Sequence, residues 1–229
     1  MDGTLYQAAA LIVPLVIAIV FHEVAHGWVA NALGDPTAKE RRRLSLNPLR
    51  HVDPVGTVLV PGALKLMGGP VFGWAKPVPV IKERLRNPRF GMMAVAAAGP
   101  ASNLLMAIVG AVALGLLVGA VGNQQPADWT RFVALNLQNF LLINIFLALF
   151  NLLPIPPFDG SHIVEGLMPR SMARSYERLR PLGFPLILIL LIVLPWLIPS
   201  FDPVGRVVVP PVEWVAERYL DLTRAVAGY

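Results

Sequence analysis

Three residues near the N-terminus have the types and the spacing of a metal-dependent hydrolytic site. His22, Glu23 and His26 lie in the pentad HEVAH. On a helix, side chains four residues apart project from one face, so both imidazoles can reach a single zinc ion. Glu23 lies one position further round the turn, where its carboxylate can accept a proton from a water molecule at the metal. The spacing therefore predicts metal-assisted peptide hydrolysis.

The pentad lies within an apolar stretch that runs from residue 5 to residue 33. At a rise of about 1.5 Å per residue, His22 is roughly 17 Å from the far end of this stretch, well inside a hydrocarbon core of about 30 Å. Polar side chains at that depth need a shared partner. Because the chain has no cysteine, its zinc ligands must be histidines and carboxylates.

The composition is that of a polytopic membrane protein. Of the 229 residues, 55% are hydrophobic and 14% are charged, and the mean hydropathy is +0.62, which is too apolar for an ordinary soluble domain. The net charge of +5 does not require a nucleic-acid partner, because the cations cluster beside apolar spans. No basic region precedes the first span, so we expect that span to be retained and not cleaved as a signal peptide.

Four segments are long and apolar enough to cross a bilayer as helices, at residues 5–33, 92–121, 132–153 and about 182–199. Basic residues concentrate at 39–50, 76–89 and 170–180, whereas the connection at 122–131 has one cation. By the positive-inside rule, the three basic connections are cytoplasmic and both termini are extracytoplasmic. The sequence thus predicts an all-α polytopic membrane protein of the cell membrane.

Residues 51–81, between the first two spans, fit neither a loop nor a crossing helix, because the segment is apolar but interrupted by many glycines and prolines. The run VFGWAKPVPVI at 71–81 favours an extended or β-hairpin conformation, which is tolerated at membrane depth only against protein or a cavity. We expect a re-entrant element whose edge pairs with unwound substrate, with Gly73, Trp74, Lys76 and Pro77 as candidate contacts. The alternative is a tethering loop on the headgroups.

Catalytic zinc usually has three protein ligands and one open position, so the pentad needs a further partner. Asp159 lies in NLLPIPPFDG at the end of the third span, where an acidic side chain is costly unless it is paired or bound to metal. An Asx turn or a helix cap is an equal alternative for it. His51 is expected to bond locally, and His162 to lie beside the ligands at most.

Several motifs together resemble the site-2 protease family of intramembrane zinc metalloproteases, peptidase family M50. They are HEVAH, SLNPLRHVDPVGT, GWAKPVPV, AAAGPASN and NLLPIPPFDG, and the resemblance covers most of residues 5–168. It implies that His22, His26 and Asp159 are the zinc ligands and that Glu23 is the general base. Phe158 stands where the family commonly has leucine. The chain also lacks the PDZ domain of some members and so resembles a short form.

Two asparagines are further candidates near the site. Asn103, after Gly99 and Pro100, can donate its amide to the oxyanion or to the substrate backbone, or it can serve helix packing or capping. Asn151 can bind substrate or orient Asp159.

We expect two regions along the chain. Residues 1–168 form a catalytic membrane core, and residues 169–229 add one more transmembrane helix and, after Pro211, an amphipathic helix at the membrane interface. The predicted function is zinc-dependent endoproteolysis of transmembrane protein substrates, with access to the active site from the cytoplasm. One alternative is a metal-binding scaffold or pseudoprotease, which binds transmembrane partners without cleaving them and could dispense with Glu23. Another is a transporter, which two similar halves of the sequence would indicate. No such repeat is evident.

Overall fold

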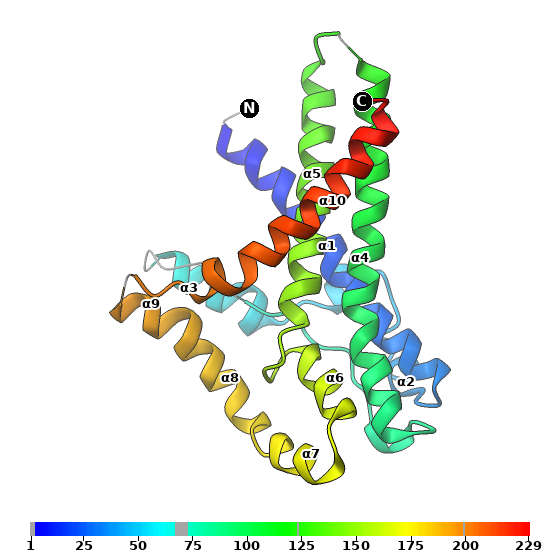
Figure 1. Cartoon of the computed structure of the whole chain (residues 1–229), viewed down its shortest axis with the longest axis vertical. Helices are drawn as coiled ribbons and strands as arrows, with labels where there is room; N and C mark the ends of the chain where they lie inside the picture. Colours follow the sequence, from blue (N-terminus) through cyan, green and yellow to red (C-terminus); the bar gives the residue numbers. More distant parts are fainter. Residues whose placement is uncertain (1–2, 67–72, 123, 199) are drawn as a thin grey trace.

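The fold is a bundle of long helices with shorter helices at its ends (Figure 1). The computed structural model describes residues 3–66, 73–122, 124–198 and 200–229, and no β-strand occurs among them. Helices α1 (Gly3–Ala32), α4 (Pro88–Val121) and α5 (Asp128–Asn151) pack against one another. Tyr6–Ala32, Pro88–Val121, Asp128–Asn151 and Arg180–Leu197 are long and apolar enough to cross a membrane. The prediction of an all-helical, multi-pass protein is confirmed.

Small residues allow the long helices to approach closely. Ala107 and Ala111 of α4 are fully buried against Leu141 and Ile145 of α5. A methyl group added at Gly110 would lie 3.0 Å from the ring of Phe140. Within a bilayer, where lipid tails are as apolar as side chains, such close contact is the main attraction between helices. Helix α4 is the centre of the bundle, since α1, α5, α6 and α10 all pack against it.

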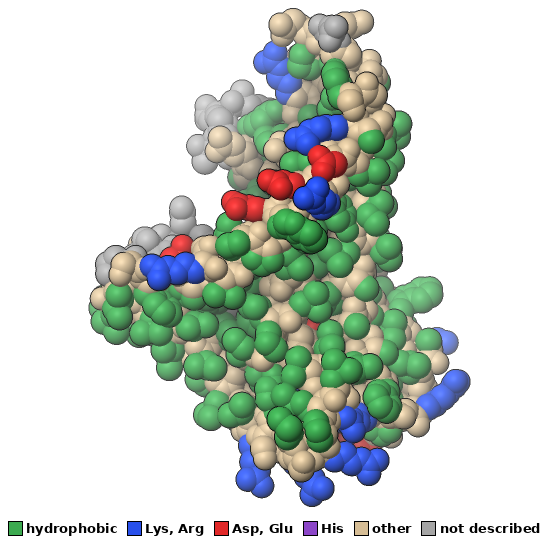
Figure 2. Space-filling view, viewed as in Figure 1, with side chains coloured by type: hydrophobic (Ala, Val, Ile, Leu, Met, Phe, Trp, Pro, Cys, Tyr) green, Lys and Arg blue, Asp and Glu red, His purple; other side chains and the backbone are tan. Residues whose placement is uncertain are grey.

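Helix α10 (Val209–Ala227) crosses α4 and α5 diagonally (Figure 1). Its buried face includes Ala216, which joins the cluster between α4 and α5. Thr223 Oγ1 donates a hydrogen bond to the carbonyl oxygen of Ala111 at 3.1 Å. The charged side chains of α10 lie on its outer face (Figure 2). The small and apolar residues of α10 therefore pack on the bundle, and its charged residues face outward.

The connection between α1 and α4 has a helical part and an extended part. It contains α2 (Thr37–Glu40), the short helices η1 (Pro48–Arg50) and η2 (Pro54–Leu59), α3 (Val60–Leu66) and η3 (Lys82–Arg84). Residues 73–81 are extended and have no strand partner among the described residues. No crossing helix forms in the parts of this connection that the structure describes, as the glycines and prolines predict. Residues 71 and 72, the first two of the run expected to be extended or a hairpin, lie outside the described residues, and the described part of that run forms no hairpin.

The fourth candidate span is interrupted. It consists of α8 (Arg180–Leu188), a wide helical turn η4 (Ile189–Val193) and α9 (Leu194–Leu197), and it leads away from the three long helices (Figure 1). It follows α6 (Asp159–Leu167) and α7 (Arg170–Glu177), and a further wide turn, η5 (Val204–Val208), precedes α10. Its first turn contacts the loop after α5, where a methyl group added at Gly183 would lie 2.6 Å from the carbonyl of Pro156.

An ionic cluster joins α6 to two other segments. Glu165 of α6 is buried and pairs with Lys82 at 3.0 Å and with Arg180. Burial alone would raise the pKa of Glu165, but the hydrogen bond from Lys82 and the charge of Arg180 lower it. Because each cation comes from a different segment, Glu165 fixes α6 relative to both η3 and α8.

A second buried carboxylate, Asp35, fixes the turn after α1. Its Oδ2 accepts from the backbone N–H of Ile81 at 2.6 Å, and its Oδ1 accepts from Thr37 N at 3.0 Å and from the Thr37 hydroxyl. Burial alone would raise its pKa, but the Thr37 and Ile81 hydrogen bonds and the charge of Arg84 hold the pKa below its ordinary value. Asp35 therefore anchors the end of the extended segment to α1.

We predict that Asp35→Ala lowers the free energy of unfolding by about 2–4 kcal/mol, because two backbone N–H groups lose their buried acceptor. Thermal unfolding in detergent at pH 7 measures the loss. Since the folded-state pKa is depressed, this contribution is present above about pH 4 and is lost as the pH falls through the folded pKa. Asp128→Ala, at an exposed carboxylate in the first turn of α5, is the matched control. Equal losses in the two variants would contradict the anchoring role of Asp35.

Candidate metal centre

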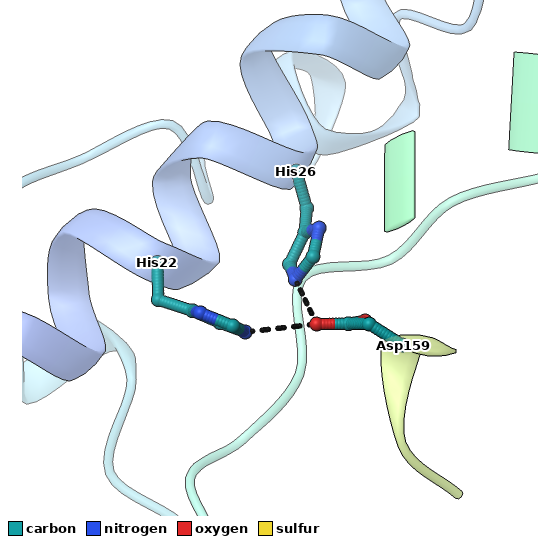
Figure 3. Close-up of side chains that lie close together, drawn as sticks. All are labelled: His22, His26 and Asp159. Carbon is teal, nitrogen blue, oxygen red and sulfur yellow. Dashed lines mark ion pairs between the residues drawn. The ribbon is translucent and has the colours of Figure 1, made fainter. Parts of the chain in front are cut away.

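Helix α1 and the first residue of α6 bring three ligand atoms together (Figure 3). His22 Nε2 and His26 Nε2 lie 3.1 and 3.3 Å from Asp159 Oδ2. The two imidazole rings are 4.7 Å apart between centroids and nearly perpendicular. All three ligand atoms lie within 4.8 Å of one another. The predicted pair of histidines and the predicted third ligand are thus brought to one point.

The loop NLLPIPPFDG folds back beneath α5 and so places Asp159. Helix α5 ends at Asn151, and the buried ring of Phe158 packs edge-on against Phe150 at 4.5 Å. A side chain at Gly160 would collide with the carbonyl groups of Leu152 and Leu153. The residue that precedes α6 is Phe158, and no side-chain capping bond is present there. Asp159 therefore faces the histidines and does not cap the helix.

The donor set fits a cation. His26 Nδ1 lies 2.7 Å from the carbonyl oxygen of Val95, and His22 Nδ1 lies 2.6 Å from Asn103 Oδ1. Both acceptors require a proton on Nδ1, so in the neutral imidazoles both Nε2 atoms carry lone pairs that point toward a carboxylate. Asp159 Oδ2 is buried and accepts no hydrogen bond from the described residues. Three acceptors that face one another in this way call for a positive ion among them, and two histidines with one carboxylate are a typical zinc donor set.

Gly99 of α4 leaves the space that the imidazoles occupy. A methyl group added at Gly99 would lie 2.5 Å from Cε1 and Nε2 of His26 and 2.6 Å from Cε1 of His22. The side chains of His22, His26 and Asp159 are 9%, 12% and 18% exposed. The site is therefore enclosed, but it is not sealed from small molecules.

Glu23 lies beside the three ligand residues and faces the extended segment. Its Oε2 accepts a hydrogen bond from the backbone N–H of Val78 at 2.8 Å, whereas its Oε1 has no hydrogen-bond partner among the described residues. The carboxylate is thus oriented by one oxygen, and the other is available. This is the arrangement that a general base needs.

The predicted substrate-edge residues Gly73, Trp74, Lys76 and Pro77 lie on the extended segment that Glu23 contacts. Trp74 N donates to Gly56 O at 3.1 Å and Lys76 N donates to His51 O at 2.9 Å. The Trp74 ring packs edge-on against Phe184 of α8 at 4.9 Å. The segment is therefore held along one side by residues 51–57.

The remaining sequence candidates have local partners. His51 is buried, and its Nε2 bonds to Ser45 O at 2.8 Å, as the local interpretation expects. His162 Nδ1 lies 2.9 Å from Arg180, and burial together with the charge of Arg180 lowers its pKa to about 4. Asn151 Nδ2 donates to Leu147 O at 2.9 Å.

Asn103 is fully buried, and its amide donates to Ala18 O at 3.2 Å and to Asn144 Oδ1 at 2.8 Å. Both of its N–H groups are therefore engaged. A role at the oxyanion would require one of these bonds to break, and it remains a prediction.

The sequence analysis missed two residues of the site and its support, Asn144 and Glu165. Asn144 is fully buried within an apolar span, and a polar residue at such a position is itself a signal of a buried partner. The partner of Asn144 lies 41 residues away in the chain, so spacing alone cannot identify it.

The chain is similar in sequence to a family of peptidases and to proteins named as zinc metalloproteases. The model of "Peptidase family M50" matches residues 125–194. YwhC of Bacillus subtilis (strain 168), named as a zinc metalloprotease, is 37% identical over 196 residues, which is 84% of this chain and 86% of that protein. Rip2 of Mycolicibacterium smegmatis, also named as a zinc metalloprotease, is 26% identical over 77% of this chain and 64% of its own length.

A third relative matches a smaller part. RasP of Oceanobacillus iheyensis, a zinc metalloprotease by name, is 33% identical over 41% of this chain and 24% of its own length. No solved structure matches the chain significantly.

We predict that Gly99→Ala weakens zinc binding at least about tenfold, because the added methyl group displaces both imidazoles. Metal analysis of the purified protein and chelator competition measure this effect. Gly110→Ala on the same helix, where the methyl group meets the edge of the flexible Phe140 ring at 3.0 Å, is expected to keep the zinc. Normal zinc affinity in Gly99→Ala would show that the imidazoles do not depend on this space.

Proposed function

Because the chain belongs to peptidase family M50, we propose that His22, His26 and Asp159 hold its catalytic zinc ion and that Glu23 is the general base. The protein is a zinc-dependent intramembrane protease. The observation that carries the assignment is the convergence of three ligand atoms within 4.8 Å. Both Nδ1 atoms are already bonded elsewhere, which supports the two Nε2 atoms as the metal-binding nitrogens.

The proposed chemistry divides between the ion and Glu23. When bound, zinc supplies a Lewis acid that polarises the scissile carbonyl and promotes ionisation of a water molecule. Glu23 takes the proton of that water through Oε1 and delivers it to the nitrogen of the leaving amine. Its bond to Val78 N holds the carboxylate in place during both transfers. His22 and His26 keep their Nδ1 protons throughout.

Residues 73–81 are proposed as the edge on which the substrate lies. In an extended chain, alternate residues present their N–H and C=O groups to opposite sides. The backbone N–H and C=O groups of Trp74 and Lys76 are hydrogen-bonded to residues 43–57, and Val78 N donates to Glu23. The opposite side belongs to Ala75, Pro77 and Pro79, of which two have no N–H. That side offers mainly carbonyl oxygens, so a substrate strand there would bind by donating its own N–H groups. Since Glu23 lies on the other side of the segment, the bond to be cut would lie beyond the paired residues.

This one-sided edge supports backbone contacts of the substrate with Gly73 and Pro77, and the side chains of Trp74 and Lys76 are proposed as further contacts. Pairing there would unwind a transmembrane substrate and expose its peptide bond, since helical hydrogen bonds otherwise shield the carbonyl. A re-entrant element between the first two spans, extended at residues 73–81, is part of this proposal. Asn151, next to the loop that carries Asp159, is a further candidate for substrate contact.

We propose that the site is reached from the cytoplasm. Asp159 begins α6, and α6, α7 and α2 lie at one end of the bundle (Figure 1). Lys and Arg side chains gather at that end in Figure 2, which supports a cytoplasmic location by the positive-inside rule. In this proposal residues 1–168 are the catalytic core, and residues 169–229 add the fourth span and α10.

We predict that Glu23→Gln reduces cleavage about 100- to 10,000-fold, because the amide cannot accept the proton. The same variant should retain about one zinc per chain. The assay uses a fluorogenic peptide with an apolar span interrupted by glycine and proline, reconstituted with the protein in liposomes. Asp159→Ala should lose both cleavage and zinc.

The two variants separate the assigned roles. Cleavage at the wild-type rate by Glu23→Gln would exclude Glu23 as the base. Full zinc content in Asp159→Ala would exclude Asp159 as a ligand, whatever the effect on cleavage. A folded wild-type protein without zinc would contradict the metal site as a whole.

The orientation can be tested without background, because the chain has no cysteine. We predict that a membrane-impermeant maleimide labels Gln125→Cys in intact cells and labels Ser175→Cys only after the membrane is opened. Both positions are exposed, one between α4 and α5 and the other on α7. The reverse labelling pattern would place the site on the extracytoplasmic side.

A further inference from the structure

A buried chain of amide groups lies behind His22, on the side away from Asp159. Asn144 of α5 and Asn103 of α4 are both fully buried. Asn144 Nδ2 lies 2.8 Å from Phe140 O, Asn144 Oδ1 lies 2.8 Å from Asn103 Nδ2, and Asn103 Oδ1 lies 2.6 Å from His22 Nδ1. Three helices are thus joined by consecutive side-chain hydrogen bonds that end at a proposed ligand.

The direction of every bond in this chain is fixed at its far end. A backbone carbonyl can only accept, so the atom of Asn144 that faces Phe140 O must be the amide nitrogen. The carbonyl oxygen of the Asn144 side chain then faces Asn103. That oxygen also only accepts, so Asn103 must present its amide nitrogen in turn.

A second carbonyl reinforces the orientation of Asn103. Its Nδ2 also lies 3.2 Å from Ala18 O on α1. Both amide protons of Asn103 are therefore used, and its Oδ1 is left to face His22. Because this oxygen can only accept, His22 Nδ1 must carry a proton, and in the neutral imidazole the lone pair of Nε2 then points toward Asp159.

We propose that Asn144 is a positioning residue of the zinc site, which acts through Asn103 to hold His22 in the metal-binding tautomer and ring orientation. The inference rests on the proposed function, since it concerns the same ion. Asn144 contributes no ligand and belongs to a helix that contributes none. Its role is to exclude the tautomer in which Nε2 carries the proton and cannot bind metal.

The two histidines differ in their dependence on such support. His26 Nδ1 bonds to the backbone carbonyl of Val95 at 2.7 Å, and no side-chain substitution removes that acceptor. His22 relies on a side chain whose own orientation depends on Asn144 and Ala18 O. Loss of Asn144 should therefore weaken metal binding through His22 alone.

The test measures zinc affinity by chelator competition in purified, detergent-solubilised full-length protein. We expect Asn144→Leu to weaken the affinity about 10- to 100-fold, the usual cost of losing a group that orients a ligand. The visible absorption of Co²⁺ bound in place of zinc should also change. Asn139→Leu is the matched control, because Asn139 of α5 donates to Ala10 O of α1 at 2.8 Å and has no bond to His22.

The coupling between the two asparagines distinguishes positioning from a loss of packing. Asn103→Leu should weaken zinc binding as much as Asn144→Leu, and the double variant should be no weaker than Asn103→Leu within about twofold. Additive losses, an unchanged affinity in Asn144→Leu, or an equal loss in Asn139→Leu would each overturn the proposal.

A conservative variant covers the case in which Asn144→Leu fails to fold. The hydroxyl group in Asn144→Ser can donate to Phe140 O and still accept from Asn103, so its affinity should lie closer to that of the wild type than that of Asn144→Ala. Equal affinities in these two variants would also overturn the proposal. If wild type binds no zinc, the proposed function fails and this inference fails with it; if wild type binds zinc and the Asn144 variants match it, only this inference fails.

Discussion

The structure depends on three acceptor atoms that are held face to face in a poorly solvated place. Two imidazole nitrogens lie 3.1 and 3.3 Å from one carboxylate oxygen, and three acceptors at these distances repel one another unless a positive charge, a metal ion or a proton, lies among them. The surrounding contacts oppose that separation. Gly99 lets the imidazoles approach α4, and Gly160 lets the loop that carries Asp159 fold under α5. The proposed ion and the packing would therefore support each other, and the apolar bundle supplies the rigidity that a small polar site needs.

Helix α4 unites these contacts although it supplies no ligand. Along one face it offers Val95 O to His26, empty space at Gly99, and the side chain of Asn103 to His22. Further along, Ala107 and Ala111 pack closely against α5. The proposed ligands come from α1 and α6, but their geometry is determined by α4, which lies between them. The extended segment that contacts Glu23 is held at its other end by Asp35.

Much of the site follows from local sequence, because the groups involved are close in the chain or have a restricted chemistry. The HEVAH spacing places two imidazoles on one helical face. Asp159 was predicted as the third ligand from the family resemblance, because its local sequence equally allows an Asx turn or a helix cap. Other features depend on contacts between distant residues. Asn144 and Asp35 resemble ordinary polar residues until their partners 41 and 46 residues away are known. The helix at 54–66 was not predicted, since its glycines and prolines are unfavourable for helices in isolation.

The length of α4 links the site to the membrane itself. Its 34 residues extend about 51 Å, whereas the hydrocarbon core is about 30 Å thick. The bilayer must accommodate this hydrophobic mismatch, and a helix does so by tilting, by projecting beyond the lipid, or by thickening the membrane around it. Since α1, α5, α6 and α10 all pack on α4, any tilt of α4 rotates the whole bundle. Lipid chain length would thus alter the depth of His22 and His26 in the bilayer, and with it the part of a transmembrane substrate that lies level with Glu23.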